Sequence, residues 1–383
     1  MRKHYFFKAP KLMIVVTTTF VSLTVTAQEK KDSISTKEES GRNVMLNASD
    51  ANKPREIQIG LPSEDVNVYE NGLPAVYSST IHQVSAHWRS DSSLERIGLL
   101  TPSESAITTG NIAYAVNSFT QLGSERFKGV LNYKANHFGL QQFDMNLSGG
   151  IGKGWLYSGS IYQNFDPGSF KIKFTDFNDR TQIYKAGITK KIADKGKISL
   201  LYKYSYDRRM ASVTTAAPFI YVGDGSVKEL PDFKLGTSSY APEDGRMTYM
   251  DVMDGKIKEG SINEFDLNKA NEVSFLSDYR FNNNMLFSFN MKYMDATANY
   301  TDFGGSTISH IENGINLDDT SDKNLYYKDA ELYSGLKEGR RTWFHTGKVK
   351  NFLITSELSK DNGLHNWKVG LNEWYYRINY HSS

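Results

Sequence analysis

Cysteine is absent from all 383 residues, and no apolar run after the N-terminal region approaches the ~20 residues of a membrane-spanning helix. The first absence excludes disulfides, thiolate metal sites and cysteine nucleophiles. A formal net charge of only +2 gives no whole-chain case for nucleic-acid binding. The sequence also lacks the G-x-x-x-x-G-K-[ST], H-E-x-x-H and G-x-S-x-G motifs. We therefore expect neither an enzyme nor a bound cofactor or metal.

The first 27 residues have the pattern of an export signal. Basic residues at positions 2, 3, 8 and 11 precede the apolar stretch 12–25, and small residues follow at 25–27. We predict cleavage between Ala27 and Gln28. The alternative, a membrane anchor, is disfavoured because the apolar stretch is short and polar residues follow at once. Residues 28–53 are charged and poor in apolar anchors, and we expect them to form a flexible N-terminal extension.

The composition changes at residue 54, where short apolar pieces alternate with clusters of Gly, Pro and Ser. This pattern, over 54–126, predicts a compact α+β unit. A unit of roughly 70 residues buries little surface of its own, so we expect it to rest against a larger partner.

From residue 127 onward, apolar and polar residues alternate in segments of about ten. Between 197 and 207, for example, Leu200, Tyr202 and Tyr204 share one face, while Lys203 and Asp207 share the other. Side chains alternate across a strand, so such segments predict strands with one apolar and one polar face. The nine predicted strands are 127–136, 142–150, 155–164, 181–192, 197–207, 271–282, 285–296, 348–359 and 366–380.

The connections between these strands are unequal in length. Four are compact turns rich in Gly, Asn and Asp, at 151–154, 193–196, 283–284 and 361–365. Three others are long, at 165–180, 208–270 and 297–347, and the connection 137–141 is a short exception. Tight turns on one side and long loops on the other are typical of a transmembrane antiparallel β-barrel. The alternative is a water-soluble β-protein, in which the aromatic residues of these strands would pack inside a β-core. Nine strands are an odd number, so we expect an incomplete barrel from the N-terminal part of a longer protein.

Four short segments precede the strands. Residues 55–62, REIQIGLP, and 66–74, VNVYENGLP, resemble the first strand and hairpin in the plug of TonB-dependent outer-membrane receptors. Residues 97–106, IGLLTPSESA, and 109–117, TGNIAYAVN, follow in the order that the family has. The residues that carry this resemblance, as structural plug-motif positions, are Gly60, Leu61, Gly72, Pro74, Pro102, Ser103, Ala106, Gly110 and Asn117.

The resemblance, which is to receptors of the Bacteroidetes type, implies a barrel of about 22 strands with the plug in its lumen. It also implies an outer-membrane location, contact with membrane lipid, and insertion by the barrel-assembly machinery. An extracellular ligand, such as a siderophore, an oligosaccharide or another nutrient complex, would enter with energy from the TonB–ExbB–ExbD complex. Two departures concern the coupling: residues 28–50 hold no convincing TonB-contact motif, and Thr101 replaces the usual glycine.

Several alternatives stay open at this stage. A surface β-barrel that binds a ligand or a host surface without transport is the second functional hypothesis. His82 and His87 are read as ordinary polar residues rather than metal ligands. Acidic residues in the long loops are read as solvated surface, with calcium binding as the alternative. Loop aromatics could stack on a ligand or pack the loops together.

Overall fold

The computed structural model describes residues 67–76, 84–100, 115–169, 171–210, 219–229, 234–235, 242–304, 308–318, 324–327, 329–338, 341–363 and 365–383. These residues belong to one compact unit. The export signal with Ala27 and Gln28, the extension 28–53, and Gly60, Leu61, Pro102, Ser103, Ala106 and Gly110 lie outside the described residues. Within the described part, no helix combines the length and apolar character needed to cross a membrane.

The small sheet contains four strands in the order β2-β1-β4-β3. Its elements are β1 (Asn67–Glu70), β2 (Leu73–Pro74), the 3-10 helix η2 (Val84–Ala86), β3 (Leu94–Leu100) and β4 (Ala115–Thr120). β1 and β2 form a hairpin through Asn71 and Gly72, both of which have positive φ. An Asn-Gly pair adopts this turn with little strain. β1 then pairs with β4 in parallel, although 44 residues of sequence, numbers 71–114, separate them.

The hydrophobic core of the small sheet is small. Val68, Ala75 and Trp88 are buried together, with Val84 and Leu94 packed against them. Such a cluster stabilises a four-stranded sheet only modestly, because stability from burial scales with apolar area. The sequence-based expectation of a unit that needs a packing partner agrees with this core.

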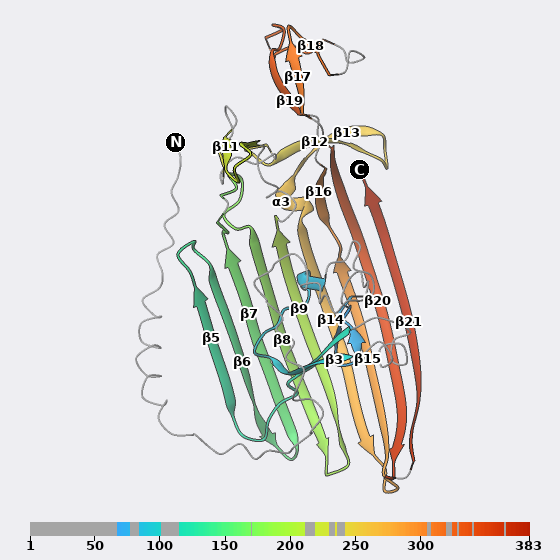
Figure 1. Cartoon of the computed structure of the whole chain (residues 1–383). Helices are drawn as coiled ribbons and strands as arrows, with labels where there is room; N and C mark the ends of the chain where they lie inside the picture. The colour runs from blue at the N-terminus through green and yellow to red at the C-terminus, as the bar shows by residue number, and fades with distance from the viewer. Residues whose placement is uncertain are drawn as a thin grey trace. The chain divides into compact units, whose positions relative to one another are not determined.

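The large sheet is antiparallel and follows the chain order from β5 to β21. It has nine long strands. They lie side by side (Figure 1). They are β5 (Lys128–Ala135), β6 (Gln141–Gly152), β7 (Trp155–Asp166), β8 (Asp179–Ile192), β9 (Gly196–Arg209), β14 (Leu267–Arg280), β15 (Met285–Thr297), β20 (Arg341–Asp361) and β21 (Asn366–Ser382). A short strand, β16 (Tyr300–Gly304), pairs with the first residues of β20.

The two ends of the large sheet differ as the connection lengths predict. At one end the strands are joined by tight turns, in which Lys153, Ala193 and Asn284 have positive φ. At the other end the long connections form separate small elements (Figure 1). These are β10 (Phe219–Tyr221) with β11 (Val227–Glu229), β12 (Arg246–Asp251) with β13 (Lys256–Ser261), the short helix α3 (Ile262–Phe265), and β17 (Ile308–Glu312) with β18 (Ile315–Asn316) and β19 (Gly335–Glu338).

All nine predicted strands are present, but several continue further toward the long connections. β14 begins four residues before the predicted residue 271, and β20 begins seven residues before the predicted residue 348. In these extensions the sequence no longer alternates between apolar and polar residues, so the pattern did not predict them. The backbone pairing nevertheless continues, since β20 already pairs with β16 there.

The burial of the large sheet is the reverse of that in a water-soluble protein. On β9, Lys203 is 5% exposed and Asp207 is 1% exposed, whereas Leu200 is 50% and Tyr202 is 44% exposed. The polar face therefore lies inside, against the small sheet, and the apolar face is uncovered. Large contiguous apolar surfaces are unfavourable in water but not in lipid. This arrangement contradicts the soluble β-core alternative.

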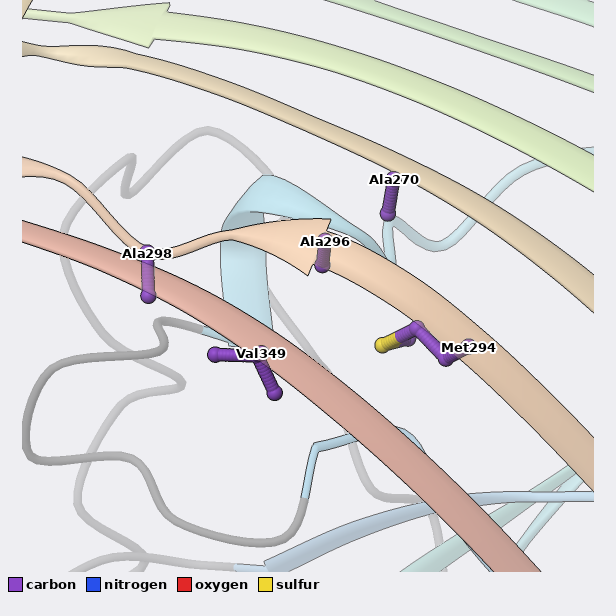
Figure 2. Close-up of a cluster of buried hydrophobic side chains, with 5 residues drawn as sticks. All are labelled: Ala270, Met294, Ala296, Ala298 and Val349. Atoms are coloured by element: carbon purple, nitrogen blue, oxygen red, sulfur yellow. The ribbon is translucent and has the colours of Figure 1, made fainter. Parts of the chain in front are cut away.

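One apolar patch interrupts the polar inner face. Figure 2 shows Ala270, Met294, Ala296 and Val349 gathered on the neighbouring strands β14, β15 and β20, with Ala298 in the connection after β15, and all five are buried. Tyr376 and Ile378 of β21 pack against them. Three of the five are alanines, so the patch presents a smooth surface with little side-chain bulk.

Candidate functional site

The interface between the small sheet and the inner face of β7, β8, β9, β14 and β15 is the candidate functional site. Most of the described contacts across it are hydrogen bonds and ion pairs. The strands bring charged side chains inward at every second residue, so their spacing follows directly from the period of a strand. Two buried charge clusters dominate this interface.

The first cluster surrounds Arg89, which follows η2. Its Nη2 atom lies 3.1 Å from Asp179 Oδ2 and 3.6 Å from Asp207 Oδ1, and it donates a hydrogen bond of 2.8 Å to Thr181 Oγ1. Arg209 Nε donates in turn to Asp207 Oδ2 at 3.0 Å. Two guanidinium groups thus balance two carboxylates, and all four are buried.

The second cluster surrounds Glu70, at the end of β1. Its carboxylate accepts a hydrogen bond from Lys203 Nζ and lies 3.2 Å from Lys185 Nζ. Lys203 also lies 3.1 Å from Glu272, which pairs with Lys292 at 3.6 Å.

Two further contacts complete this second cluster. Lys185 pairs with Asp91 at 3.2 Å, and Lys292 Nζ donates to the carbonyl oxygen of Pro74. Three lysines of the large sheet are therefore balanced by Glu70 and Asp91 from the small-sheet side and by Glu272 of the large sheet itself. The charges balance within a largely buried cluster.

The pKa values of the two groups at the centre of these clusters reflect their partners. Burial alone would raise the pKa of the Glu70 carboxyl, but the ammonium groups of Lys203 and Lys185 outweigh it and hold that pKa well below its usual range. Burial would likewise lower the pKa of Arg89, whereas Asp179 and Asp207 raise it above the ordinary value. Both groups are therefore charged at neutral pH.

Further hydrogen bonds join the remaining parts of the interface. Asp144 of β6 accepts from the backbone nitrogen of Ser92 at 2.9 Å and from its hydroxyl at 2.6 Å. His87 Nδ1 shares a hydrogen bond of 2.7 Å with Ser205 Oγ. Thr189 Oγ1 donates to the carbonyl oxygen of Leu122 at 2.6 Å. These contacts span β6 to β9, so the small sheet is tied along much of the inner face.

A small space lies between the described residues of the two sheets. A cavity of about 20 Å³ lies beside the Glu70 cluster, lined by Glu70, Lys185, Lys203, Glu272 and neighbouring residues. This volume accommodates about one water molecule. A solute larger than water cannot pass this part of the interface unless the ion pairs separate.

Three of the sequence-predicted plug-motif residues lie within the described structure, and they adjoin this interface. The backbone nitrogen of Gly72 donates to Asn117 Oδ1 at 3.1 Å, which ties the β1–β2 turn to β4. Pro74 contributes the carbonyl oxygen that Lys292 contacts. Their assignment as family motif positions stays a prediction.

Lys203 and Asp207 were predicted to share the polar face of their strand, but the partners of these residues and of Lys292 were not predicted. It did not single out Arg89, Glu70 or Asp91 at all. Charged residues at inward strand positions were the available signal. Which plug residue would meet which strand depends on how the two sheets dock, and no local pattern encodes that.

The loop aromatics partly pack against one another. Tyr249 meets Phe344 edge to face at 5.2 Å between ring centroids, and Tyr327 meets Tyr333 at 5.0 Å. Phe219 and Tyr221, on β10, are 47% and 65% exposed. Some loop rings therefore stabilise the loops, and others present open surface at the same end of the molecule.

No protein-family model matches the chain, and no curated protein sequence matches it. Among solved structures it is similar to that of the FpvAI–pyocin S2 complex, with 11% identity and a TM-score of 0.51, over 82% of this chain and 36% of that one. It is also similar to BauA, the ferric preacinetobactin receptor from Acinetobacter baumannii. That match has 10% identity and a TM-score of 0.51, over 84% of this chain and 40% of that one.

At these identities the likeness establishes the fold. The chain has the plug-and-barrel fold of TonB-dependent outer-membrane receptors, with a small plug sheet and a partial antiparallel barrel. It spans about two fifths of the length of the solved proteins that it matches. From here on, the small sheet and η2 are called the plug.

Proposed function

We propose that this chain is the N-terminal part of a TonB-dependent outer-membrane receptor that imports a ligand too large for passive pores. The observation that carries the proposal is the reversed polarity of the large sheet. Its apolar face is exposed, as lipid contact requires, and its polar face is buried against a plug held by balanced charges.

The chemistry of the interface supports a plug that can move. Buried ion pairs add little net stability, because desolvation offsets much of their attraction. When such an interface opens, water replaces the lost partners. Water could not replace the lost contacts of an apolar interface in this way, and opening such an interface would expose apolar surface to water. Polar contacts therefore suit a plug that is displaced and returns.

We infer the energy source and the ligand class from the same likeness of fold. The TonB–ExbB–ExbD complex would pull on the N-terminal extension from the periplasm. BauA is named for a ferric chelate, and this makes ferric siderophores the first ligand class to test. Oligosaccharides are the second, because exposed loop rings such as Tyr221 offer flat stacking surfaces.

A disulfide lock gives a direct test, because these 383 residues contain no cysteine of their own. Ser92→Cys with Asp144→Cys would join plug and barrel, where the two side chains are 2.6 Å apart. Ser288→Cys with Asp278→Cys is the matched control, because these side chains lie 2.8 Å apart and both belong to the barrel sheet. Both pairs are introduced into the complete natural gene product in its own bacterium.

We expect the Ser92–Asp144 lock to abolish energised uptake of labelled ferric siderophores or oligosaccharides, and a reductant to restore it. The control crosslink should leave uptake unchanged. Full uptake through a quantitatively formed plug–barrel disulfide would contradict the proposal. Surface binding that persists without any uptake by the unmodified protein would instead favour a non-transporting barrel.

A further inference from the structure

The plug is attached unevenly to the inner face of the large sheet. Among the described residues, its hydrogen bonds and ion pairs concentrate on β6, β8 and β9. The strand residues that make them are Asp144, Asp179, Thr181, Lys185, Lys203, Ser205 and Asp207. On the other side, β15 contributes Asn290 and Lys292, which donate to the backbone carbonyl oxygens of Asn71 and Pro74. Separation on the side of β15 therefore breaks fewer of these polar contacts.

The apolar patch lies on this less attached side of the inner face (Figure 2). One row of paired residues joins the two sides, since Ser205 pairs with Ala270, and Ala270 pairs with Ala296. At Ser205 the plug is hydrogen-bonded through His87, whereas an alanine side chain cannot form such a bond. Because alanine buries little apolar area, uncovering the patch costs little, and a solute that lies against it would cover it again.

A polar side chain beside the patch has an atom without a partner. Asn351 of β20 is 1% exposed and pairs in register with Met294 of the patch. Its Nδ2 atom lies 4.0 Å from Met294 Sδ, and its Oδ1 atom is buried with no hydrogen-bond partner among the described residues. A buried amide oxygen in this condition lowers the stability of the fold. A hydroxyl or N–H group of a solute that reaches the patch would supply the missing hydrogen bond.

Three stacked rings lie at the end of the patch that is nearer to the long connections. His345 precedes Val349 by four residues on β20, so both side chains share the inner face. Tyr300 and Tyr380 stack on His345, with ring centroids 4.2 and 5.7 Å away. Stacked rings present a flat surface on which planar or sugar-like groups can pack. The rings, the patch and Asn351 therefore follow one another along β20.

We propose that the imported solute passes along the apolar patch, from the ring stack at His345 to the amide of Asn351, while β6, β8 and β9 keep the plug attached. The solute carries hydroxyl or amide groups, because these are the groups that the Asn351 oxygen accepts from. In this structure all residues of the patch are buried, so the passage is closed. The inference rests on the proposed function, since it requires transport.

Cysteine labelling in the complete natural gene product, in its own bacterium, reports which side of the plug separates. Ala296→Cys tests the patch, and Ser205→Cys is the matched control, because the two residues belong to one row and are 3% and 1% exposed. The reagent is a charged maleimide that does not cross membranes. During energised uptake of labelled ferric siderophores or oligosaccharides, the thiol at position 296 should react about tenfold faster than at rest, because opening sets the reaction rate of a buried group. The thiol at position 205 should react at its resting rate.

Two substitutions test the passage by its effect on uptake. Ala296→Phe should reduce uptake about tenfold and leave binding at the cell surface unchanged, because the added ring fills the space beside the patch. Asn351→Leu has nearly the same volume but removes the amide, and we expect about fivefold slower uptake from the loss of one hydrogen bond. The same variant should unfold at a higher denaturant concentration, since it no longer buries an unpartnered oxygen. A merely structural role of Asn351 would change stability and leave uptake as it was.

The remaining outcomes separate this inference from the proposed function. Equal labelling at positions 205 and 296 during uptake would mean that the plug leaves the wall on both sides, and the passage along the patch would be rejected. Uptake without faster labelling at position 296, or full uptake by Ala296→Phe, would also reject it, while the receptor proposal would stand. Failure of the unmodified protein to take up either kind of solute would overturn both.

Discussion

The two faces of strand β9 have opposite environments although their residues are neighbours in sequence. Lys203 and Asp207 face the plug and are buried among charged partners, whereas Leu200 and Tyr202 face outward and are largely exposed. In water the reverse would be stable. The difference shows that the solvent on each side of the sheet, rather than the composition of the strand, decides which face is covered.

The inner face satisfies its charges internally, and the outer face depends on its surroundings. Each buried lysine or arginine of the two clusters has a carboxylate within 4 Å. The exposed apolar rows have no comparable partner within the described residues. This contrast predicts that substitutions on the inner face disturb plug docking, whereas substitutions on the outer face disturb contact with lipid.

The largest expected effect comes from breaking the inner face at Arg89. Arg89→Met leaves Asp179 buried without its cation and Asp207 with Arg209 alone, and such a loss costs about 3–5 kcal/mol. We expect the plug to become protease-sensitive and the midpoint of denaturant unfolding to fall. Arg96→Met is the control, because Arg96 is exposed and lies over the Phe119 ring. Equal stability of the two variants would show that the buried cluster does not hold the plug.

The outer face is tested by introducing a charged residue at an exposed position, where the substitution would cost little stability in a water-soluble protein. Leu200 is half exposed, so Leu200→Arg would change the stability of a soluble protein little. In a barrel it places a cation in the lipid band, and the expected cost is about 2–4 kcal/mol. Unfolding in phosphatidylcholine vesicles measures this cost. An unchanged free energy of unfolding there would contradict lipid contact at this face.

The junction between the loops and the sheet should respond to pH through Asp266. Burial raises the pKa of its carboxyl to about 8, even though the backbone nitrogen of Thr301 donates to it at 2.7 Å. Between about pH 4 and that value, the folded state binds more protons than the unfolded state. The free energy of unfolding should therefore fall as pH rises through this range.

Asp266→Asn should remove this pH dependence and leave the protein more stable at pH 8. Glu70 does not interfere, because its lowered pKa gives a contribution that is lost only at strongly acidic pH. Denaturant titrations at several pH values measure the slope. A slope that is identical in the variant and the unmodified chain would place the titration elsewhere.

The smallest expected effect concerns the hairpin turn of the plug. Gly72 has φ of +77°, and a Cβ added there would meet Asn290 Nδ2 at an ordinary 3.6 Å. The cost of Gly72→Ala is therefore backbone strain alone, about 1–2 kcal/mol. Gly98→Ala is the control, because Gly98 lacks positive φ and has similar space around it. Thermal unfolding of the two variants should differ by this amount, and equal midpoints would refute the strain argument.

Much of the large sheet could be predicted from the sequence because alternation is a local property. The faces of Leu200 and Lys203 follow from their spacing alone, and the tight turn at Asn283 and Asn284 follows from residues that tolerate positive φ. The extra length of β20 could not be predicted. Its first residues pair with β16, a strand that is distant in sequence and has no strong pattern of its own.

The candidate site was less accessible to sequence reasoning. The inward position of Lys203 was predicted, but its partner Glu70 lies 133 residues away. Arg89 follows a 3-10 helix of three residues, which is too short to be predicted from hydrophobic periodicity. Contacts of this kind arise only when two separately patterned sheets meet.

The sequence by itself determined the strands, their two faces and the unequal connections, because each depends on residues close together in the chain. Only the tertiary structure decided which charges meet and which face is covered. The physical reason is that ion pairs and burial depend on distances in space, and strand register and plug docking set those distances across large separations in sequence.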